Sequence, residues 1–133
     1  MNYWLVKQEP ENYSFDDLLR DGKTVWDGVR NYQARNNLRE MRVGDKVLFY
    51  HSVSEKAVVG SAEIARESFP DPNDEKWLAV EIVPVEKFAK AVTLNEIKAA
   101  EDLENIALIK QSRLSVLPLS KEEFKALIEL SKR

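Results

Sequence analysis

Five stretches of the chain combine apolar, β-branched and aromatic residues in the way that is typical of strands. They are residues 3–7, 46–51, 57–66, 76–88 and 114–117. Gly60, inside the third stretch, predicts a bulge or a close approach of another group to the backbone. Pro84 interrupts the fourth stretch, and the Pro-rich residues 69–74 before it predict a hairpin loop.

Polar residues that suit helix N-caps precede four further segments. Ser14 is followed by two aspartates in what would be the first helical turn, where negative charge is favourable, and Gly22 ends this helix. Asn31 caps a second helix that we expect to end at about Met41. The remaining N-caps are Thr93 and Ser120, and each begins the pattern of a capping box.

The order of these elements indicates the fold class. A strand is followed by two helices, then by a block of strands, and then by further helices. Because this order lacks strict alternation of strands and helices, the predicted class is α+β. A curved sheet or a small β-barrel flanked by short helices satisfies it, and closure into a barrel would remove exposed strand edges.

The length and hydropathy of the chain narrow its class. A chain of 133 residues, of which 44% are hydrophobic, is long enough for one core, so we expect a single domain over residues 1–133. Its apolar runs are much shorter than the roughly 20 residues of a membrane-spanning helix. Its first residues lack the pattern of a secretory signal. We therefore expect a cytoplasmic protein without a membrane partner.

Charge and cysteine content exclude several kinds of chemistry. Cysteine is absent and His51 is the one histidine, so disulfides and thiolate nucleophiles are excluded, and neither a metal nor a cofactor is expected. The net charge of −3 argues against a protein that coats duplex DNA through bulk positive charge. Half of the arginines nevertheless fall between residues 30 and 42, which favours a local cationic site.

Three of these arginines follow a helical period. Ala34, Leu38 and Met41, at intervals of four and three residues, share one apolar face of the second predicted helix. Arg35, Arg39 and Arg42 repeat that spacing one residue later and form a neighbouring stripe. Guanidinium groups bind phosphate oxygens in a bidentate manner, so the stripe predicts phosphate contacts. The alternative is a solvated helix face that pairs with nearby carboxylates.

The turn before this helix places an aromatic residue beside cationic and polar ones. Trp26 is followed by Gly28, Arg30 and the N-cap Asn31. A helix N-terminus attracts anions, and an indole offers a face on which a base can stack. Trp26 could instead be a core residue, but its position next to Gly28 and Arg30 favours a site.

A second group of polar residues ends the strand at residues 46–51. Tyr50, His51 and Ser52 lie there, and ligands often gather at such strand ends in barrels. Side chains alternate along a strand, so His51 and Ser52 point to opposite faces and no hydrolytic dyad is expected. The glycines match no nucleotide-binding fingerprint. No catalytic residue is therefore predicted.

Three segments together resemble the EVE domain family. They are YWLVKQEP at residues 3–10, WDGVRNYQARN at residues 26–36 and GDKVLFYHS at residues 44–52. Shorter segments at residues 13–18, 70–72 and 113–116 continue the match, so it extends over nearly the whole chain. The resemblance implies a PUA-like fold, in which short helices flank a curved mixed sheet or small β-barrel.

The same resemblance implies a function. EVE domains and their relatives bind nucleic acid, often with a modified base in a pocket. The chain is thus expected to be a non-catalytic module that recognises a modified base, either a modified cytosine in DNA or a base in RNA. Trp26 is implied as the wall on which the base stacks. The other implied base-binding or ligand-binding residues are Lys7, Arg30, Asn31, Tyr32, Tyr50, His51, Ser52 and Arg113.

Two other classes of function stay open at this level. The net negative charge is compatible with a module that binds a small molecule or a protein partner through the same pocket. A nucleotide-processing enzyme is less favoured, because the chain has a single histidine and no cysteine. The sequence leaves open the choice between DNA and RNA, and also the oligomeric state.

Overall fold

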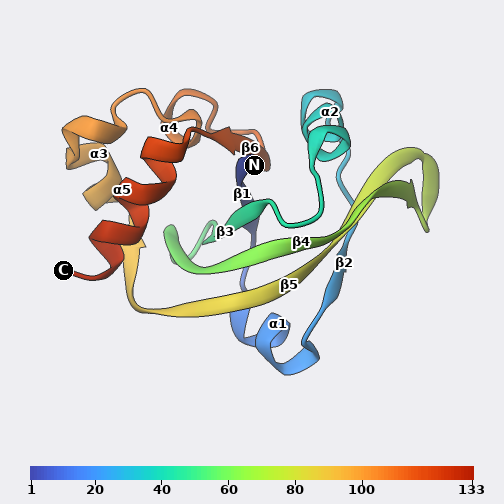
Figure 1. Ribbon diagram of the computed structural model, residues 1–133, viewed down its shortest axis with the longest axis horizontal. Helices are drawn as coiled ribbons and strands as arrows, with labels where there is room; N and C mark the ends of the chain where they lie inside the picture. The colour runs from blue at the N-terminus through green and yellow to red at the C-terminus, as the bar shows by residue number, and fades with distance from the viewer.

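A long, twisted hairpin of two antiparallel strands dominates the computed structural model, which describes residues 1–133 (Figure 1). The hairpin consists of β4 (Ala57–Asp71) and β5 (Asp74–Thr93). The other strands are β1 (Tyr3–Gln8), β2 (Thr24–Trp26), β3 (Lys46–His51) and β6 (Val116–Leu119). The helices are α1 (Phe15–Asp21), α2 (Tyr32–Glu40), α3 (Leu94–Ala99), the 3-10 helix η1 (Glu101–Leu103), α4 (Ala107–Lys110) and α5 (Lys121–Ser131).

The six strands form one curved sheet in the order β2-β5-β4-β3-β1-β6. The β1–β3 pair is parallel and every other pair is antiparallel, so the sheet is mixed. Figure 1 shows α3, α4 and α5 gathered on one side of the hairpin and α1 on the other. The predicted α+β class with a curved sheet is confirmed. The sheet does not close into a barrel, and β2 and β6 remain its two edges.

Short-range hydrogen bonds begin the helices where the sequence predicts. The side chains of Ser14, Thr93 and Ser120 each accept a hydrogen bond from the backbone amide three residues on, and the acidic side chain at that position accepts one from the backbone amide of the cap residue. Asn31 caps α2 through its side-chain oxygen, which accepts from the Ala34 amide at 3.0 Å. Gly22 ends α1 with φ +74°, a conformation that costs glycine little.

The sheet differs from the prediction in its extent. Strand β5 continues through Pro84, where the register with β4 shifts at Ser61 and Ala62, and proline is tolerated at such irregularities. Strand β6 begins two residues later than expected, and the short helices η1 and α4 were not predicted. The predicted hairpin loop is confirmed, because β4 and β5 join through a tight turn after Asp71.

The buried apolar side chains form a single cluster that includes both faces of β3, and aromatic rings pack together within it. Phe49 contacts Phe15 and Trp26 edge to face, with ring centroids 5.4 Å apart in both pairs. The close approach predicted at Gly60 is confirmed, since a Cβ atom there would lie 2.6 Å from the Phe15 ring. The aromatic cluster therefore holds α1 and β2 against the middle of the sheet.

Candidate functional site

Trp26 is the last residue of strand β2, and its side chain contacts the hydrophobic core and also lines a cavity. Its side chain is only 5% exposed, because its ring packs edge-on against Phe49 at an interplanar angle of 84°. It also lines a cavity of about 260 Å³. The other lining residues are Gln8, Asn12, Tyr13, Thr24, Val25 and Asp27. The indole is thus fixed from behind by the core, and an opening remains beside it.

The polar groups around this cavity retain hydrogen-bonding capacity. The Gln8 side-chain oxygen accepts from the Glu9 amide at 3.0 Å, which leaves the Gln8 amide nitrogen without a protein partner. The Asn12 nitrogen donates to Glu9, which leaves the Asn12 oxygen as an acceptor. The Asp27 carboxylate has one long contact, with Asn73 at 3.5 Å. The cavity therefore offers a donor amide, an acceptor amide and a carboxylate near one aromatic wall.

Asp71 fixes the loop that follows Trp26. Its buried carboxylate accepts from the Gly28 amide at 2.9 Å, from the Arg30 guanidinium at 3.0 Å and from the Asn73 amide at 2.7 Å. Burial by itself raises the pKa of Asp71, but these hydrogen bonds outweigh it and hold the pKa below the usual value. Residues 27–30 are therefore anchored to the turn between β4 and β5.

Arg30, Tyr32 and Arg35 gather on the outer side of this loop around a residue that the sequence analysis did not select. That residue is Trp77 of β5, whose ring centroid lies 5.1 Å from that of Tyr32. The Arg35 guanidinium lies 4.9 Å from the Tyr32 ring and 5.8 Å from the Trp77 ring. Arg30 lies 5.7 Å from Trp77. Four side chains thus form a cationic and aromatic surface on the outer side of the loop that follows Trp26.

Lys7, Tyr50 and Ser52 come together on the opposite face of the sheet. They line a cavity of about 370 Å³, together with Lys56 and residues from α3 and α4. Lys7 donates to the Ser112 carbonyl at 2.8 Å. Burial lowers the pKa of Lys7 and raises the pKa of Tyr50, because both charged forms lose hydration there. This cavity is separate from the Trp26 cavity, because adjacent residues of a strand face opposite ways.

Asn31 and Arg113 line a shallower hollow of about 330 Å³ between α2 and the segment after α4. It adjoins the Lys7 cavity, since Ser112 lines both. The Asn31 oxygen is already used as the α2 cap. Arg113 is exposed. These two predicted residues therefore lie together but apart from Trp26.

His51 is on the Trp26 face, with both ring nitrogens occupied. Its Nε2 accepts from the Phe15 amide at 3.1 Å, so the proton of the neutral ring resides on Nδ1. Nδ1 lies 3.0 Å from Glu55. The ring also packs edge-on against Phe49. His51 therefore supports the start of α1 and the loop after β3.

The predicted arginine stripe divides along α2. Only Arg35 reaches the aromatic pair. Arg39 stays at the surface and donates to Asn36 at 3.3 Å. Arg42 donates to the carbonyl groups of Arg39 and Met41 at 3.0 Å, and so satisfies the end of the helix.

The residues that the sequence analysis missed come from segments far apart in the chain. Gln8 and Asn12 line the Trp26 cavity although three strands separate β1 from β2 in the curved sheet, and Trp77 lies near the loop that leads to Tyr32 because β5 pairs with β2. A Trp in a strand-like run was the one signal for Trp77, and burial in the core would explain such a residue equally well.

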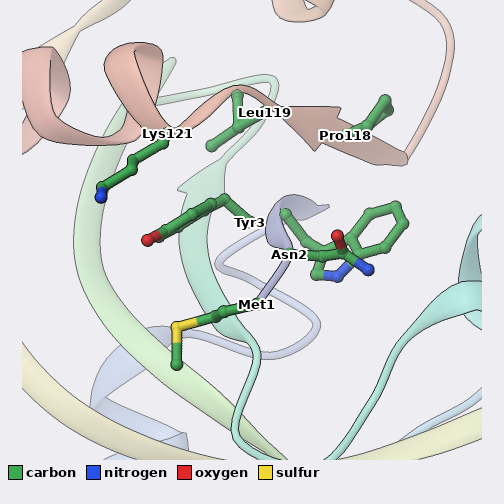
Figure 2. A pocket seen from close by; sticks show the side chains of 7 residues that line it. Met1, Asn2, Tyr3, Pro118, Leu119 and Lys121 are labelled. Atoms are coloured by element: carbon green, nitrogen blue, oxygen red, sulfur yellow. The ribbon is translucent and has the colours of Figure 1, made fainter.

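The largest cavity, of about 480 Å³, lies elsewhere. Figure 2 shows Met1, Tyr3 and Lys121 around its opening, with Leu119 and Pro118 beside them. Trp4 lines it too, but its indole nitrogen donates to buried Asp45 at 3.0 Å. None of the predicted site residues lines this cavity.

Neither a metal cluster nor a membrane-spanning helix is found in the structure. No group of three or more His, Cys, Asp or Glu side chains is arranged to hold a metal ion. No helix has the length and apolar character needed to cross a membrane.

Comparison with known proteins identifies relatives of the whole chain. The model of the EVE domain family matches residues 2–130. Thymocyte nuclear protein 1 of Mus musculus is 34% identical over 165 aligned positions, which cover 97% of this chain and 73% of the mouse protein. The human THYN1 protein, solved in complex with DNA that contains 5-methylcytosine, superposes with a TM-score of 0.94. It is 32% identical, and the match covers 100% of this chain and 99% of the human one.

A more distant similarity concerns the fold alone. The YTH domain of the Zygosaccharomyces rouxii MRB1 protein, solved with N6-methyladenosine RNA, superposes with a TM-score of 0.65 at 13% identity. The match covers 99% of this chain and 87% of the YTH domain. The curved sheet with flanking helices is thus shared with a fold that extends beyond the sequence family.

Proposed function

This chain belongs to the EVE domain family, and from that premise we propose that it binds DNA without catalysis and holds a modified cytosine in the cavity beside Trp26. The 5-methylcytosine DNA complex of the human relative supports this choice of ligand. The observation that carries the proposal is the 260 Å³ opening against an indole that the core otherwise encloses. Drug-sized ligands occupy about 300–1,000 Å³, so this smaller opening suits one planar base.

The polar lining matches the hydrogen-bonding edge of cytosine. Cytosine presents an exocyclic N4 amine as a donor, with N3 and O2 as acceptors. The Asp27 carboxylate accepts from N4, and the unpaired amide nitrogen of Gln8 donates to N3 or O2. Thymine carries the same 5-methyl group as 5-methylcytosine but has a carbonyl oxygen at position 4, which a carboxylate repels. Asp27 therefore favours cytosine, which has an amine at position 4, over thymine.

Recognition of the methyl group is assigned to an apolar contact. Val25 lines the cavity and is 39% exposed, so it has apolar surface left to cover. Burial of one methyl group is worth about 0.8 kcal/mol, which corresponds to a roughly fourfold preference over unmodified cytosine. We expect a modest preference from this contact alone.

A base reaches such a cavity only outside the helical stack. Extrusion of a base from a duplex costs a few kcal/mol, and less at a mismatch or in a single strand. The chain has a net charge of −3, so phosphate binding depends on local cations and not on overall charge. Arg35 and Arg39 of α2 supply such cations, because neither forms an ion pair with a carboxylate, whereas Arg30 is paired with Asp71.

The same geometry supports a role without catalysis. Both nitrogens of His51 are engaged with Phe15 and Glu55, and the chain has no cysteine. No side chain around Trp26 forms the nucleophile and base pair that covalent catalysis requires. The cavity is therefore suited to binding.

The test compares oligonucleotides that differ in one base. Fluorescence anisotropy would measure the Kd for strands that carry 5-methylcytosine, cytosine or thymine at one central position. We expect the order 5-methylcytosine, then cytosine, then thymine. Asp27→Ala should weaken the preference for 5-methylcytosine over thymine by about tenfold, the value of one hydrogen bond to a charged group.

Matched variants separate this effect from general electrostatics. Asp102→Ala removes the same charge at an exposed position on η1. It should leave the ratio of the Kd values for the thymine and 5-methylcytosine strands unchanged. Trp26→Phe keeps an aromatic ring in the core and should weaken binding to all three strands. Equal affinity of the wild-type protein for the three strands would disprove the proposed function, and tighter binding of the matching RNA strand would disprove the choice of DNA.

A further inference from the structure

The Tyr32–Trp77 pair is the most exposed aromatic cluster of the molecule. Tyr32 is 66% exposed at the first position of α2, and its ring is inclined by 33° to that of Trp77. Trp77 is half-buried and forms the base of the cluster. Stability does not require Tyr32 to be aromatic, because an exposed ring buries little surface. The exposed ring is thus available to a ligand.

Arg35 is held by these rings more than by hydrogen bonds. Its Nη1 donates to the Lys76 carbonyl at 3.1 Å, and no other protein acceptor contacts its guanidinium. Its Nε is enclosed without any partner. Most native arginines in such a position have their donors satisfied. The guanidinium is therefore positioned between two rings with donor capacity to spare.

We propose that Tyr32, Trp77 and Arg35 form a second nucleotide site, which stacks another unpaired base of the same DNA strand and contacts its phosphate. This inference rests on the proposed function, and it adds a ligand position on a surface outside the Trp26 cavity. An aromatic face binds any base by stacking, and an arginine fork binds phosphate oxygens. The site is therefore expected to tolerate every base.

A short loop connects the two sites. Five residues separate Trp26 from Tyr32, so their Cα atoms lie at most about 22 Å apart even in an extended chain. Trp26 is opposite Val80, and Trp77 is three residues earlier on β5, so strand alternation places the Trp77 side chain on the other face of the sheet from Trp26. Figure 1 shows β2, α2 and the twisted end of the hairpin on one side of the molecule.

Asp71 keeps this distance constant. Its carboxylate binds both the Gly28 amide and the Arg30 guanidinium, and Arg30 in turn lies over Trp77. The loop between the two sites is therefore clamped to the hairpin that carries Trp77. Because β2 is an edge strand, a single DNA strand that passes around this edge can contact both sites without a rearrangement of the protein.

The test removes the flanking base from the DNA and the ring from the protein. Kd values would be measured by anisotropy for a single strand with one 5-methylcytosine, and for strands in which each flanking nucleotide in turn is replaced by an abasic one. For the wild-type protein, one flanking abasic position should weaken binding by about 5-fold to 100-fold, the range for one stacked base. Tyr32→Ala should weaken binding of the intact strand by the same factor, and Tyr32→Phe should not.

Combining Tyr32→Ala with the abasic replacement tests whether the ring of Tyr32 and the flanking base contact each other. With Tyr32→Ala, the abasic replacement at that position should have no further effect, because both changes remove one contact. The preference for 5-methylcytosine over thymine should persist in this variant. Leu19→Ala and Arg20→Ala, on exposed positions of α1, control for apolar surface and charge. Arg35→Ala should also reduce the dependence of Kd on salt, and Arg20→Ala should not.

The outcomes separate this inference from the proposed function. If the wild-type protein prefers 5-methylcytosine but tolerates an abasic nucleotide at every flank, the second site is disproved and the first stands. The second site would also be disproved if Tyr32→Ala and the abasic replacement each weakened binding and their two factors multiplied when the changes were combined. If the wild-type protein binds none of the strands, both proposals fail.

Discussion

The carboxylate of Asp71 accepts a hydrogen bond from the amide of Gly28 at 2.9 Å, across 43 positions of sequence. The same oxygen accepts from Arg30 at 3.0 Å. These contacts join the loop after Trp26 to the turn of the long hairpin. Any change at Asp71 should therefore affect both stability and the geometry of the candidate site.

Replacement of Asp71 should lower stability in a pH-dependent way. Asp71→Ala removes the acceptor of two part-buried amides and of the Arg30 guanidinium, and we expect a loss of about 1–3 kcal/mol in the free energy of unfolding. The pKa of Asp71 is lowered in the folded protein, so its contribution is present above the ordinary pKa of 3.8 and is lost as the pH falls through the lower folded value. Urea unfolding at neutral and acid pH would measure both effects.

An exposed carboxylate on the same hairpin gives the control for this experiment. Glu75→Gln should change the free energy of unfolding by less than about 0.5 kcal/mol. The difference between wild type and Asp71→Asn should shrink as the solution is acidified. A difference that stays constant with pH would contradict the assignment of the stabilisation to the ionised carboxylate.

Gly60→Ala should destabilise the protein through a steric conflict. A Cβ atom there would lie 2.6 Å from the Phe15 ring and 2.8 Å from the Glu86 carbonyl oxygen, and the backbone carbonyl cannot easily move. We expect a loss of about 1–3 kcal/mol, measured by thermal or urea unfolding. Ala65→Val adds methyl groups at an exposed position of the same strand and should be nearly neutral. Equal stability of the two variants would show that the close contact relaxes without cost.

Substitutions of Asn31 distinguish a helix cap from a ligand contact. Asn31→Ala should cost about 1 kcal/mol of folding stability, because the Ala34 amide loses its acceptor. Asn31→Ser restores an acceptor and should recover most of that loss. If Asn31 also contacts DNA, both variants should weaken binding to the same extent. Full recovery of affinity by serine would instead limit Asn31 to the capping role.

Lys7 should react as an amine at lower pH than an unfolded lysine does. Burial in the cavity with Tyr50 lowers the pKa of Lys7, so the neutral, nucleophilic form is populated earlier on titration. Acetylation with mass-spectrometric detection would follow Lys7 in the native and the urea-unfolded protein. We expect the native curve to rise at lower pH, and superposition of the two curves would contradict the shift.

The same shift predicts a stability effect of defined sign. Between the folded and the unfolded pKa of Lys7, the unfolded chain binds more protons, so the free energy of unfolding should increase with pH in that window. Lys7→Met should remove this increase. An unchanged pH dependence in the variant would assign the increase to other groups.

The sequence by itself determined most of the local structure. The capping boxes at Thr93 and Ser120, the cap at Asn31 and the strand at residues 46–51 depend on interactions within a few positions, and all lie where the sequence predicts. The α+β class and the EVE family followed from the order of these elements and from the matching segments. The helix α4 escaped prediction, because it spans only four residues and has no side-chain cap.

Only the tertiary structure decided which side chains share a cavity. Trp26 was selected from sequence, but Gln8 joins it through the arrangement of β1 and β2, and Trp77 joins Tyr32 through the pairing of β5 with β2. The sheet also places Tyr50 and His51 on opposite faces, so they serve different surroundings. Such contacts depend on strand pairings between distant parts of the chain, and the local pattern of polar and apolar residues does not encode those pairings.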